Sequence, residues 1–301
     1  MNEPALELSI VIPAFNEEKR LGATLARICE YFVGRPPNPP REGSGQVTAL
    51  TSTPVTAGAP QASGGQTETP RVTRPRTAAL LEIILVDDGS SDGTARLAQE
   101  YARTIPCLRV LSKQRNRGKG YSVHRGMLEA RGQIAVFTDA DLSSPIEESA
   151  RLLGAIADGN DVAIGSRALD RSLIDVHQSR FREVAGIIFN RFVRLVTGLP
   201  IEDTQCGFKA FRMPECRIIF EQQRIAGFGF DPEILFLAKR HGLRVSEVPV
   251  RWSHDAGTKV HVLHDSVRML RDLFRVRLNW ALGRYPRRRV PKRPATKPTT
   301  G

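Results

Sequence analysis

Long apolar stretches are absent from this chain, because charged residues interrupt every hydrophobic run short of the roughly 18 residues that a membrane-spanning helix needs. The segment from Met1 to Glu7 has no basic region ahead of an apolar one, so the sequence predicts neither a signal peptide nor a transmembrane helix. Cysteine is scarce as well, with four residues and no CxxC pair. This pattern favours buried free thiols in a reducing compartment over a disulfide framework.

Aromatic residues make up only 6% of the chain, although its net charge of +12 would suit a nucleic-acid-binding protein. No RNA-binding or zinc-finger pattern accompanies the charge, and no aromatic residues interleave with it. Much of the excess lies near the C-terminus, in a stretch without any acid: Arg284, Arg287, Arg288, Arg289, Lys292, Arg293 and Lys297. Such a tail attracts anionic lipid headgroups as readily as phosphate backbones, so we expect a membrane surface as a partner and no nucleic acid.

The chain has 301 residues, of which 41% are hydrophobic, enough for one large α/β domain or two small ones. Apolar runs of strand length alternate with segments of helical periodicity up to Gly165, which predicts a mainly parallel, doubly wound sheet flanked by helices. The expected strands are Leu8–Ile12, Leu81–Val86, Leu108–Leu111, Ile134–Thr138 and Asp161–Gly165. The expected helices begin near Glu17 and near Asp92, and span Gly118–Ala130 and Ile146–Ala157.

Two parts of the chain depart from this alternation. Residues 34–77 are dominated by Pro, Gly, Ser, Thr and Gln, which predicts a disordered insertion. After Gly165 the alternation is lost, and Phe181–Val196 and Val260–Trp280 are expected to be amphipathic helices with arginine on their polar sides. Each helix could pack on the sheet or lie in a bilayer interface, and the basic tail favours peripheral contact with a membrane.

Two acidic pairs close two of the expected strands. Asp87 and Asp88 follow the strand Leu81–Val86, and Asp139 and Asp141 follow Ile134–Thr138. A carboxylate just past the carboxyl end of a buried strand lies where open α/β sheets bind ligands. Asp139 and Asp141 can hold one hard divalent cation, Mg²⁺ or Mn²⁺, against a diphosphate. The alternative for the first pair is a simple turn, since Asp, Gly and Ser favour turns.

Two further segments carry polar groups to the same edge. Pro13, Asn16 and Glu17 follow the first strand, where the polar pair can bind a base or ribose or can cap the next helix. Lys119 lies in the segment Asn116-Arg117-Gly118-Lys119-Gly120, directly before a helix. Helix N-termini and lysines both favour phosphate, although the spacing is not that of a P-loop.

In this order and spacing, these segments resemble glycosyltransferase family 2, whose members have the GT-A fold and use nucleotide-diphosphate sugars. The resemblance runs from Leu8 to about Lys259. It implies that Pro13, Asn16, Glu17 and Asp87 or Asp88 hold the nucleoside, and that Asp139 and Asp141 bind Mg²⁺ or Mn²⁺. The implied GT-A domain comprises residues 1–33 and 78–259, followed by an amphipathic helix over 260–283 and a basic disordered tail over 284–301.

The downstream motifs resemble the polyprenyl-phosphate sugar transferases of this family. They are Gly165-Ser166-Arg167, Asp203-Thr204-Gln205-Cys206-Gly207-Phe208-Lys209, Phe230-Asp231-Pro232-Glu233, Val248-Pro249-Val250-Arg251-Trp252, His254 and Gly257-Thr258-Lys259. The second motif is most similar to the dolichyl-phosphate β-glucosyltransferase branch, which implies a UDP-sugar donor, with glucose favoured. The chain departs from the family in its long insertion and in lacking the C-terminal membrane helices of some relatives, so we expect a peripheral enzyme on the cytoplasmic face of a membrane.

A polyprenyl phosphate is already an anion near neutral pH, so its transfer needs no strong general base. In-line attack on an α-linked donor would invert the anomeric centre. We expect Arg167 with Ser166 to grip the acceptor phosphate, and Gln205, Lys209, His254 and Lys259 to contribute around the phosphates. Cys206 is expected to be a packed thiol.

Two rival functions stay open on sequence alone. A family 2 transferase with a carbohydrate, lipid or protein hydroxyl acceptor would need a free carboxylate as base, from Asp203, Asp231 or Glu233. A non-catalytic anion- or nucleic-acid-binding protein would need no base and no turnover.

Overall fold

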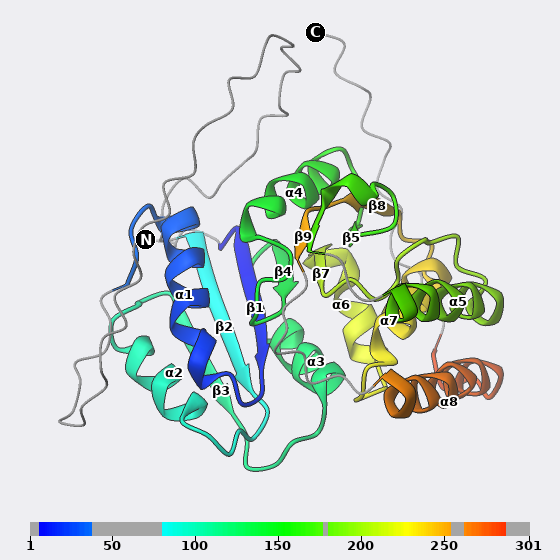
Figure 1. The fold of residues 1–301 in the computed structure, drawn as a ribbon, viewed down its shortest axis with the longest axis horizontal. Coiled ribbons are helices and arrows are strands. Elements are labelled where there is room, and N and C mark those ends of the chain that lie inside the picture. Colours follow the sequence, from blue (N-terminus) through cyan, green and yellow to red (C-terminus); the bar gives the residue numbers. More distant parts are fainter. Residues whose placement is uncertain (1–5, 38–79, 177–179, 254–261, 287–301) are drawn as a thin grey trace, which may run out of the picture.

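A seven-stranded, mainly parallel sheet forms the centre of the computed structural model, which describes residues 6–37, 80–176, 180–253 and 262–286 (Figure 1). Its strand order is β3-β2-β1-β4-β7-β5-β8, and only β7 runs antiparallel to its neighbours. The strands are β1 (Leu8–Ala14), β2 (Leu81–Asp87), β3 (Leu108–Ser112), β4 (Ile134–Thr138), β5 (Val162–Ser166), β7 (Phe208–Arg212) and β8 (Val245–Pro249). The expected α/β fold with a mainly parallel sheet is confirmed.

Helices cover both faces of this sheet because the strand residues alternate between two separate apolar cores. Ile83 and Leu85 pack with α1, α2 and α4, whereas Ile84 and Val86 pack with α3, α6 and α7. The helices are α1 (Glu18–Val33), α2 (Thr94–Ala102), α3 (Lys119–Glu129), α4 (Ser149–Ala157), α5 (Arg180–Thr197), α6 (Met213–Gln222), α7 (Phe230–Arg240) and α8 (Val262–Ala281). Of the helices described, none is long and apolar enough to cross a membrane.

The strand β1 extends one residue beyond Pro13, which the sequence had suggested as its end. Proline has no backbone N–H, so in a strand that is paired on both sides it leaves one hydrogen bond to a neighbouring strand unmade. Here β4 pairs with β1 only as far as Val11, so the backbone at Pro13 has a partner only in β2. The extra residue places Ala14 beside Asp87 and brings the loops after both strands together.

The expectation that the alternation is lost after Gly165 is wrong. The strands β7 and β8 enter the sheet, and β6 (Ile174–Val176) pairs with β9 (Trp252–Ser253) in a second, two-stranded sheet. The segment of β7 escaped detection because a fully buried lysine, Lys209, interrupts its apolar residues. The edge strand β8 contains Ser246, Glu247 and Pro249 and is only half-buried.

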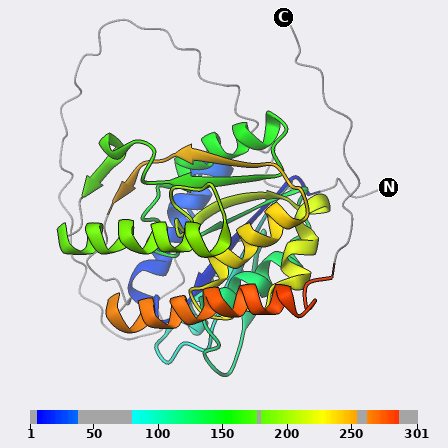
Figure 2. The same ribbon diagram turned by 90° about the vertical axis from the view of Figure 1, so that its right-hand side faces the viewer.

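The two expected amphipathic helices are present as α5 and α8, and they lie side by side on the outside of the molecule (Figure 2). A contact between the rings of Phe192 and Phe274 joins them, with centroids 6.1 Å apart. Helix α8 also packs on α7. Most of the predicted insertion, 34–77, and most of the predicted tail, 284–301, lie outside the described residues.

Candidate active site

The carboxyl ends of β1, β2 and β4 bring the expected donor-site residues to one edge of the sheet. Asn16 and Glu17 follow β1, Asp87 and Asp88 end β2, and the acid pair follows β4. Outside glycine, the described residues have two positive φ angles, 56° at Asn16 and 48° at Leu142. Asn16 lies two residues beyond the end of β1, and Leu142 directly follows Asp141. Strained backbone of this kind concentrates at functional sites, so the edge is the candidate active site.

The loops after β1 and β2 hold each other through polar contacts. The Oδ1 atom of Asn16 accepts a hydrogen bond from the Ser91 N–H (2.8 Å), and the Asn16 N–H donates to the Ser90 hydroxyl (2.9 Å). The carboxylate of Glu17 pairs with Arg20 at 2.9 Å. Asn16 and Glu17 therefore shape the loops at this end of the edge, and their contact with a base or ribose stays a prediction.

Asp88 connects β2 to the start of α3. Its carboxylate accepts hydrogen bonds from the N–H groups of Arg117 and Gly118 at 3.1 and 2.7 Å. Gly89 has a φ of +73°, and a Cβ there would lie 2.7 Å from the backbone of Arg115. The Asp-Asp-Gly-Ser segment thus needs its glycine, and Asp88 fixes the N-terminus of α3 against the sheet.

Asp139 directly follows β4 at this edge of the sheet. Its carboxylate pairs with the Lys119 ammonium at 2.5 Å. A Cβ on Gly207, just before β7, would collide with the Asp139 carboxylate, so a larger residue there would displace that side chain. Asp141 accepts the Ser143 N–H (2.9 Å), and burial together with the charge of Asp139 raises its pKa.

Behind the acid pair is a buried ion pair between Lys209 and Asp231. The Lys209 side chain is 0% exposed, and its ammonium lies 2.5 Å from Asp231 and 2.6 Å from the carbonyl oxygen of Cys206. The expectation that Lys209 contacts a phosphate is therefore not met in this structure, because its side chain is fully buried and two of its three N–H donors bind inside the protein. Burial raises the pKa of Asp231, against the opposing charge of Lys209.

Arg167 and Asp203 form a second pair one strand further along. Asp203 binds the Arg167 Nε at 2.6 Å and Nη2 at 2.8 Å, and it also accepts the Arg167 backbone N–H. Burial alone would raise the pKa of Asp203, but Arg167 outweighs it and lowers the pKa. Asp203 thus orients Arg167 and leaves Nη1 as the guanidinium nitrogen that it does not hold. Ser166, expected beside Arg167 on a phosphate, is fully buried, and its hydroxyl accepts the Ala168 N–H.

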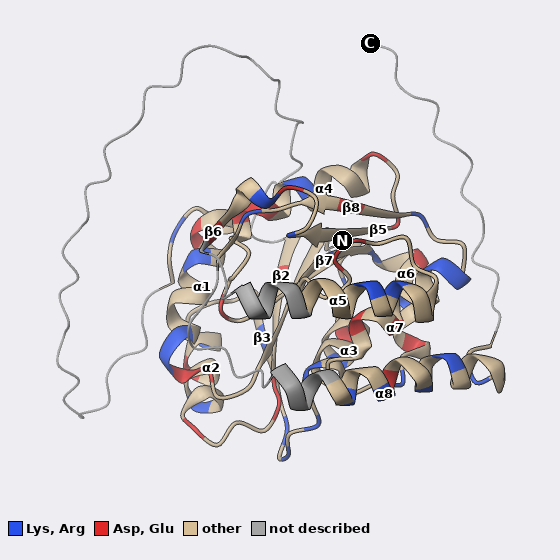
Figure 3. Cartoon of the chain, turned by 45° about the vertical axis from the view of Figure 1, so that its right-hand side comes forward, with Lys and Arg blue, Asp and Glu red and all other residues tan. Residues whose placement is uncertain are grey.

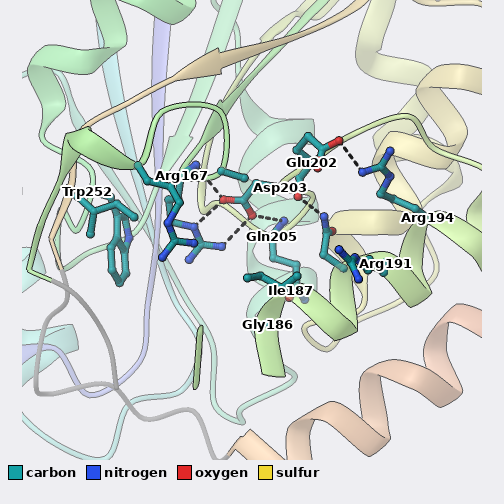
Figure 4. A pocket seen from close by; sticks show the side chains of 13 residues that line it. Arg167, Gly186, Ile187, Arg191, Arg194, Glu202, Asp203, Gln205 and Trp252 are labelled. Atoms are coloured by element: carbon teal, nitrogen blue, oxygen red, sulfur yellow. Dashed lines mark hydrogen bonds and ion pairs between the residues drawn. The ribbon is translucent and has the colours of Figure 1, made fainter. Parts of the chain in front are cut away.

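A pocket of about 330 Å³ opens between this pair and α5 (Figure 4). Four arginines line it, together with apolar surface from Ala168, Ile174, Ile187 and Trp252. The arginines are Arg167, Arg171, Arg191 and Arg194. Arg194 is held by Glu202, and the Arg167 guanidinium stands over the Trp252 ring at 5.4 Å. The pocket therefore suits a ligand with an anionic head and an apolar body.

Sequence reasoning missed most of this pocket lining. Arg191 and Arg194 are three residues apart on one helix and could have been noticed as a basic pair facing one way. Trp252 had no signal beyond its motif. Gln205, which was expected near the phosphates, does line the pocket, and its side-chain amide lies 3.7 Å from the Met269 sulfur of α8. His254 and Lys259 lie outside the described residues.

The three carboxylates that could serve a hydroxyl acceptor as base are all engaged. Asp203 holds Arg167 and Asp231 holds Lys209. Glu233 accepts the N–H groups of Arg224 and Ile225 and the hydroxyl of Tyr285. Burial raises the pKa of Glu233 to about 7, but its contacts tie it to the end of α8. In the described part of the site, none of these three carboxylates is thus free to act as a base.

The acid pair fits a divalent cation. Burial, and after it the charge of the nearby Asp139, raises the pKa of Asp141, so a cation bound by both carboxylates would relieve their repulsion. Lys119 supplies one such charge to Asp139. The described residues contain no group of three or more His, Cys, Asp or Glu that could hold a metal, so a cation here would draw its other oxygen ligands from substrate phosphate and water.

The sequence is similar to those of known sugar transferases. A model of glycosyl transferase family 2 matches residues 71–214. A dolichyl-phosphate β-glucosyltransferase of Drosophila melanogaster is 33% identical over 94% of this chain and 78% of its own length. The chain belongs to glycosyltransferase family 2. The human dolichyl-phosphate β-glucosyltransferase, another relative, is 28% identical over 94% of this chain and 79% of its own length. This glycosyltransferase is a hexosyltransferase.

Solved structures show the same fold. The glucosyl-3-phosphoglycerate synthase of Mycobacterium tuberculosis superposes with a TM-score of 0.56 over 90% of this chain and 80% of its own, at 18% identity. One structure of that synthase was solved in complex with Mn²⁺, UDP-glucose and phosphoglyceric acid, and it matches with a TM-score of 0.55. The GT-A fold of this family 2 chain is thereby confirmed.

Proposed function

We propose that this family 2 enzyme transfers glucose from UDP-glucose to a polyprenyl phosphate, such as dolichyl phosphate, with inversion at the anomeric carbon. One observation carries the proposal: Asp139 of the acid pair lies against Gly207, and Asp203 and Gln205 of the same segment line an arginine-rich pocket with apolar walls. The relatives named for this reaction in fly and human support the sugar and the acceptor.

The donor half comprises the edge from β1 to β4. Asp139 and Asp141 would hold Mg²⁺ or Mn²⁺, and the N-terminus of α3, fixed by Asp88, would face the phosphates. An ion held there would neutralise the charge that develops on the departing diphosphate. The Mn²⁺ and UDP-glucose bound by the synthase of the same fold support this assignment.

The acceptor half is the pocket between Arg167 and α5. A phosphate monoester is anionic at neutral pH and can attack without losing a proton to a base. Engagement of all three candidate carboxylates therefore favours a phosphate acceptor over a hydroxyl one. Family membership likewise disfavours a protein that only binds anions. Arg167, held at a fixed angle by Asp203, would orient the phosphate, and Ile187 and Trp252 would face the first isoprene units.

The proposal is tested by incubating the pure chain with Mn²⁺, polyprenyl phosphate and a panel of radiolabelled UDP- and GDP-sugars. We expect label from UDP-glucose to enter the organic phase, and chelation of the metal to abolish transfer. Label from a GDP-sugar alone would overturn the donor assignment. Consumption of UDP-glucose only with a sugar acceptor would instead establish the hydroxyl-acceptor alternative.

A lipid acceptor requires contact with a membrane, and α5 with α8 offers a suitable surface. Val267, Phe274 and Leu278 recur at helical spacing on α8 and are between 56% and 68% exposed. They lie opposite the buried stripe that contains Leu273 and Val276. On α5, Ile188 and Leu195 are 61% and 80% exposed. We call these five residues the apolar stripe.

Figure 3 shows several basic positions along α8. The arginines next to the apolar stripe are Arg268, Arg271, Arg275 and Arg277, all exposed, whereas Asp272, one of the two acids of this helix, is buried. Apolar side chains bordered by arginines match an anionic bilayer interface. Ile187 and Arg191, on the same helix as Ile188, line the acceptor pocket, so a lipid phosphate could enter it from this surface.

Replacement of Leu195 and Leu278 together by glutamate should weaken binding to phosphatidylserine-containing vesicles by about tenfold or more, because burying one leucine contributes roughly 2 kcal/mol. Cosedimentation measures the effect. Both side chains are mostly exposed, so the thermal midpoint should change little. The exposed Ala157→Glu on α4 is the matched control. If the double variant bound vesicles as tightly as the wild type, α5 and α8 would not form the membrane-contact surface.

A further inference from the structure

Lys119 neutralises Asp139, one of the two carboxylates that a divalent cation would need. Its ammonium lies 2.5 Å from Asp139. Lys119 is thus the cation that neutralises Asp139, whereas the nearby Asp231 forms its ion pair with Lys209.

The backbone on both sides of Lys119 is closely packed. On one side of it, a Cβ on Gly118 would lie 2.6 Å from the carbonyl oxygen of Ala226. On the other, a Cβ on Gly120 would lie 2.7 Å from the carbonyl oxygen of Gly227 and from Phe230. Asp88 in addition binds the N–H of Gly118. The long side chain of Lys119 is therefore the part that we expect to respond when the charges at Asp139 change.

A divalent ion and an ammonium group repel each other strongly in a partly buried site, so both cannot share the Asp139 carboxylate at contact distance. The four-carbon stem of lysine can carry the ammonium to a new position without backbone movement. The nearest new negative charge in the proposed reaction is the diphosphate of the donor, which arrives at the N-terminus of α3.

We propose that Lys119 is an internal placeholder for the divalent cation: it neutralises Asp139 in the empty enzyme, releases it when the cation binds, and then pairs with the donor diphosphate. Metal and lysine thus compete for Asp139 until the nucleotide gives the lysine another partner. The inference rests on the proposed metal-dependent donor site. It predicts that nucleotide and metal strengthen each other's binding, since the nucleotide removes the competitor.

The test is titration with Mn²⁺ alone, followed by paramagnetic resonance of free Mn²⁺, for the wild-type chain and Lys119→Met. Methionine keeps the length of the side chain and removes the charge. We expect Mn²⁺ to bind the variant about tenfold more tightly, within the usual range of coupling between two sites. With Mn²⁺ saturating, we expect the same variant to bind UDP about tenfold more weakly by calorimetry. A merely structural lysine would not shift the two affinities in opposite directions.

Lys113→Met is the matched control, because Lys113 belongs to the same edge but its ammonium stands over the Tyr121 ring. Its removal should leave Mn²⁺ affinity within about twofold of wild type, since it does not compete for Asp139. Lys119→Arg retains the charge and should not gain Mn²⁺ affinity. Equal or weaker Mn²⁺ binding by Lys119→Met would overturn the placeholder, even if the variant remains folded. If the wild-type chain binds no Mn²⁺ with or without UDP, the proposed metal site itself fails.

Discussion

Asp139→Asn should lower the turnover of glucose transfer by about a thousandfold. The amide keeps the size of the side chain but removes the charge that holds the metal and that meets Lys119. Loss of a preorganised charge at the leaving group costs about 10² to 10³ in rate in other enzymes. Radiolabel transfer to polyprenyl phosphate at saturating UDP-glucose measures the effect. Asp141→Asn should lower turnover by a similar factor, because Asp141 is the second proposed ligand of the cation.

The structure supplies a matched control for this prediction. Asp158 is exposed at the end of α4, at the amino end of β5 and away from the catalytic edge. Asp158→Asn should therefore retain wild-type turnover. If Asp139→Asn kept turnover within tenfold of wild type, the diphosphate would not be neutralised at this acid pair and the proposed donor site would be wrong.

Arg167→Lys should lower kcat/KM for the polyprenyl phosphate by about a hundredfold and leave KM for UDP-glucose unchanged. Lysine keeps the positive charge that the buried Asp203 requires, so the fold should persist. It cannot replace the two parallel hydrogen bonds that Asp203 makes to Nε and Nη2, or direct a third nitrogen into the pocket. Initial rates with each substrate varied in turn separate the two effects.

Arg217→Lys on α6 is the control for the chemical change itself, since Arg217 is half exposed and pairs with Glu221 at 3.8 Å. It should leave both kinetic constants at their wild-type values. A rise in KM for UDP-glucose, with the acceptor unaffected, would assign Arg167 to the donor instead of the acceptor.

The parallel half of the fold could be predicted from sequence because each of its strands is a short, continuous apolar run ended by turn residues. Ile134–Thr138 was predicted to the residue, and Leu81–Asp87 within one residue. The segment Phe208–Arg212 lacks such a pattern, since the buried Lys209 is neutralised by Asp231, 22 residues away. A contact of that kind has no local signature, and neither does the reversed direction of β7.

The same distinction holds for the site. Asp139 and Asp141 were found because they directly end a buried strand, and Gly89 because turns favour glycine. The pairing of Arg167 with Asp203 was not predicted, because these residues are 36 positions apart in the sequence. The side chains of Arg191 and Trp252 meet across one pocket only once β5, α5 and the segment after β8 are assembled.

The reversed direction of β7 divides the chain into two functional parts. A parallel strand delivers to the catalytic edge only the residues that follow it, whereas β7 delivers those that precede it, from Asp203 to Gly207. The proposed metal and nucleoside contacts all precede Leu142, and the proposed contacts of the acceptor all follow Gly165. Under the proposed function, a change of acceptor would therefore call for substitutions in the second half of the chain alone.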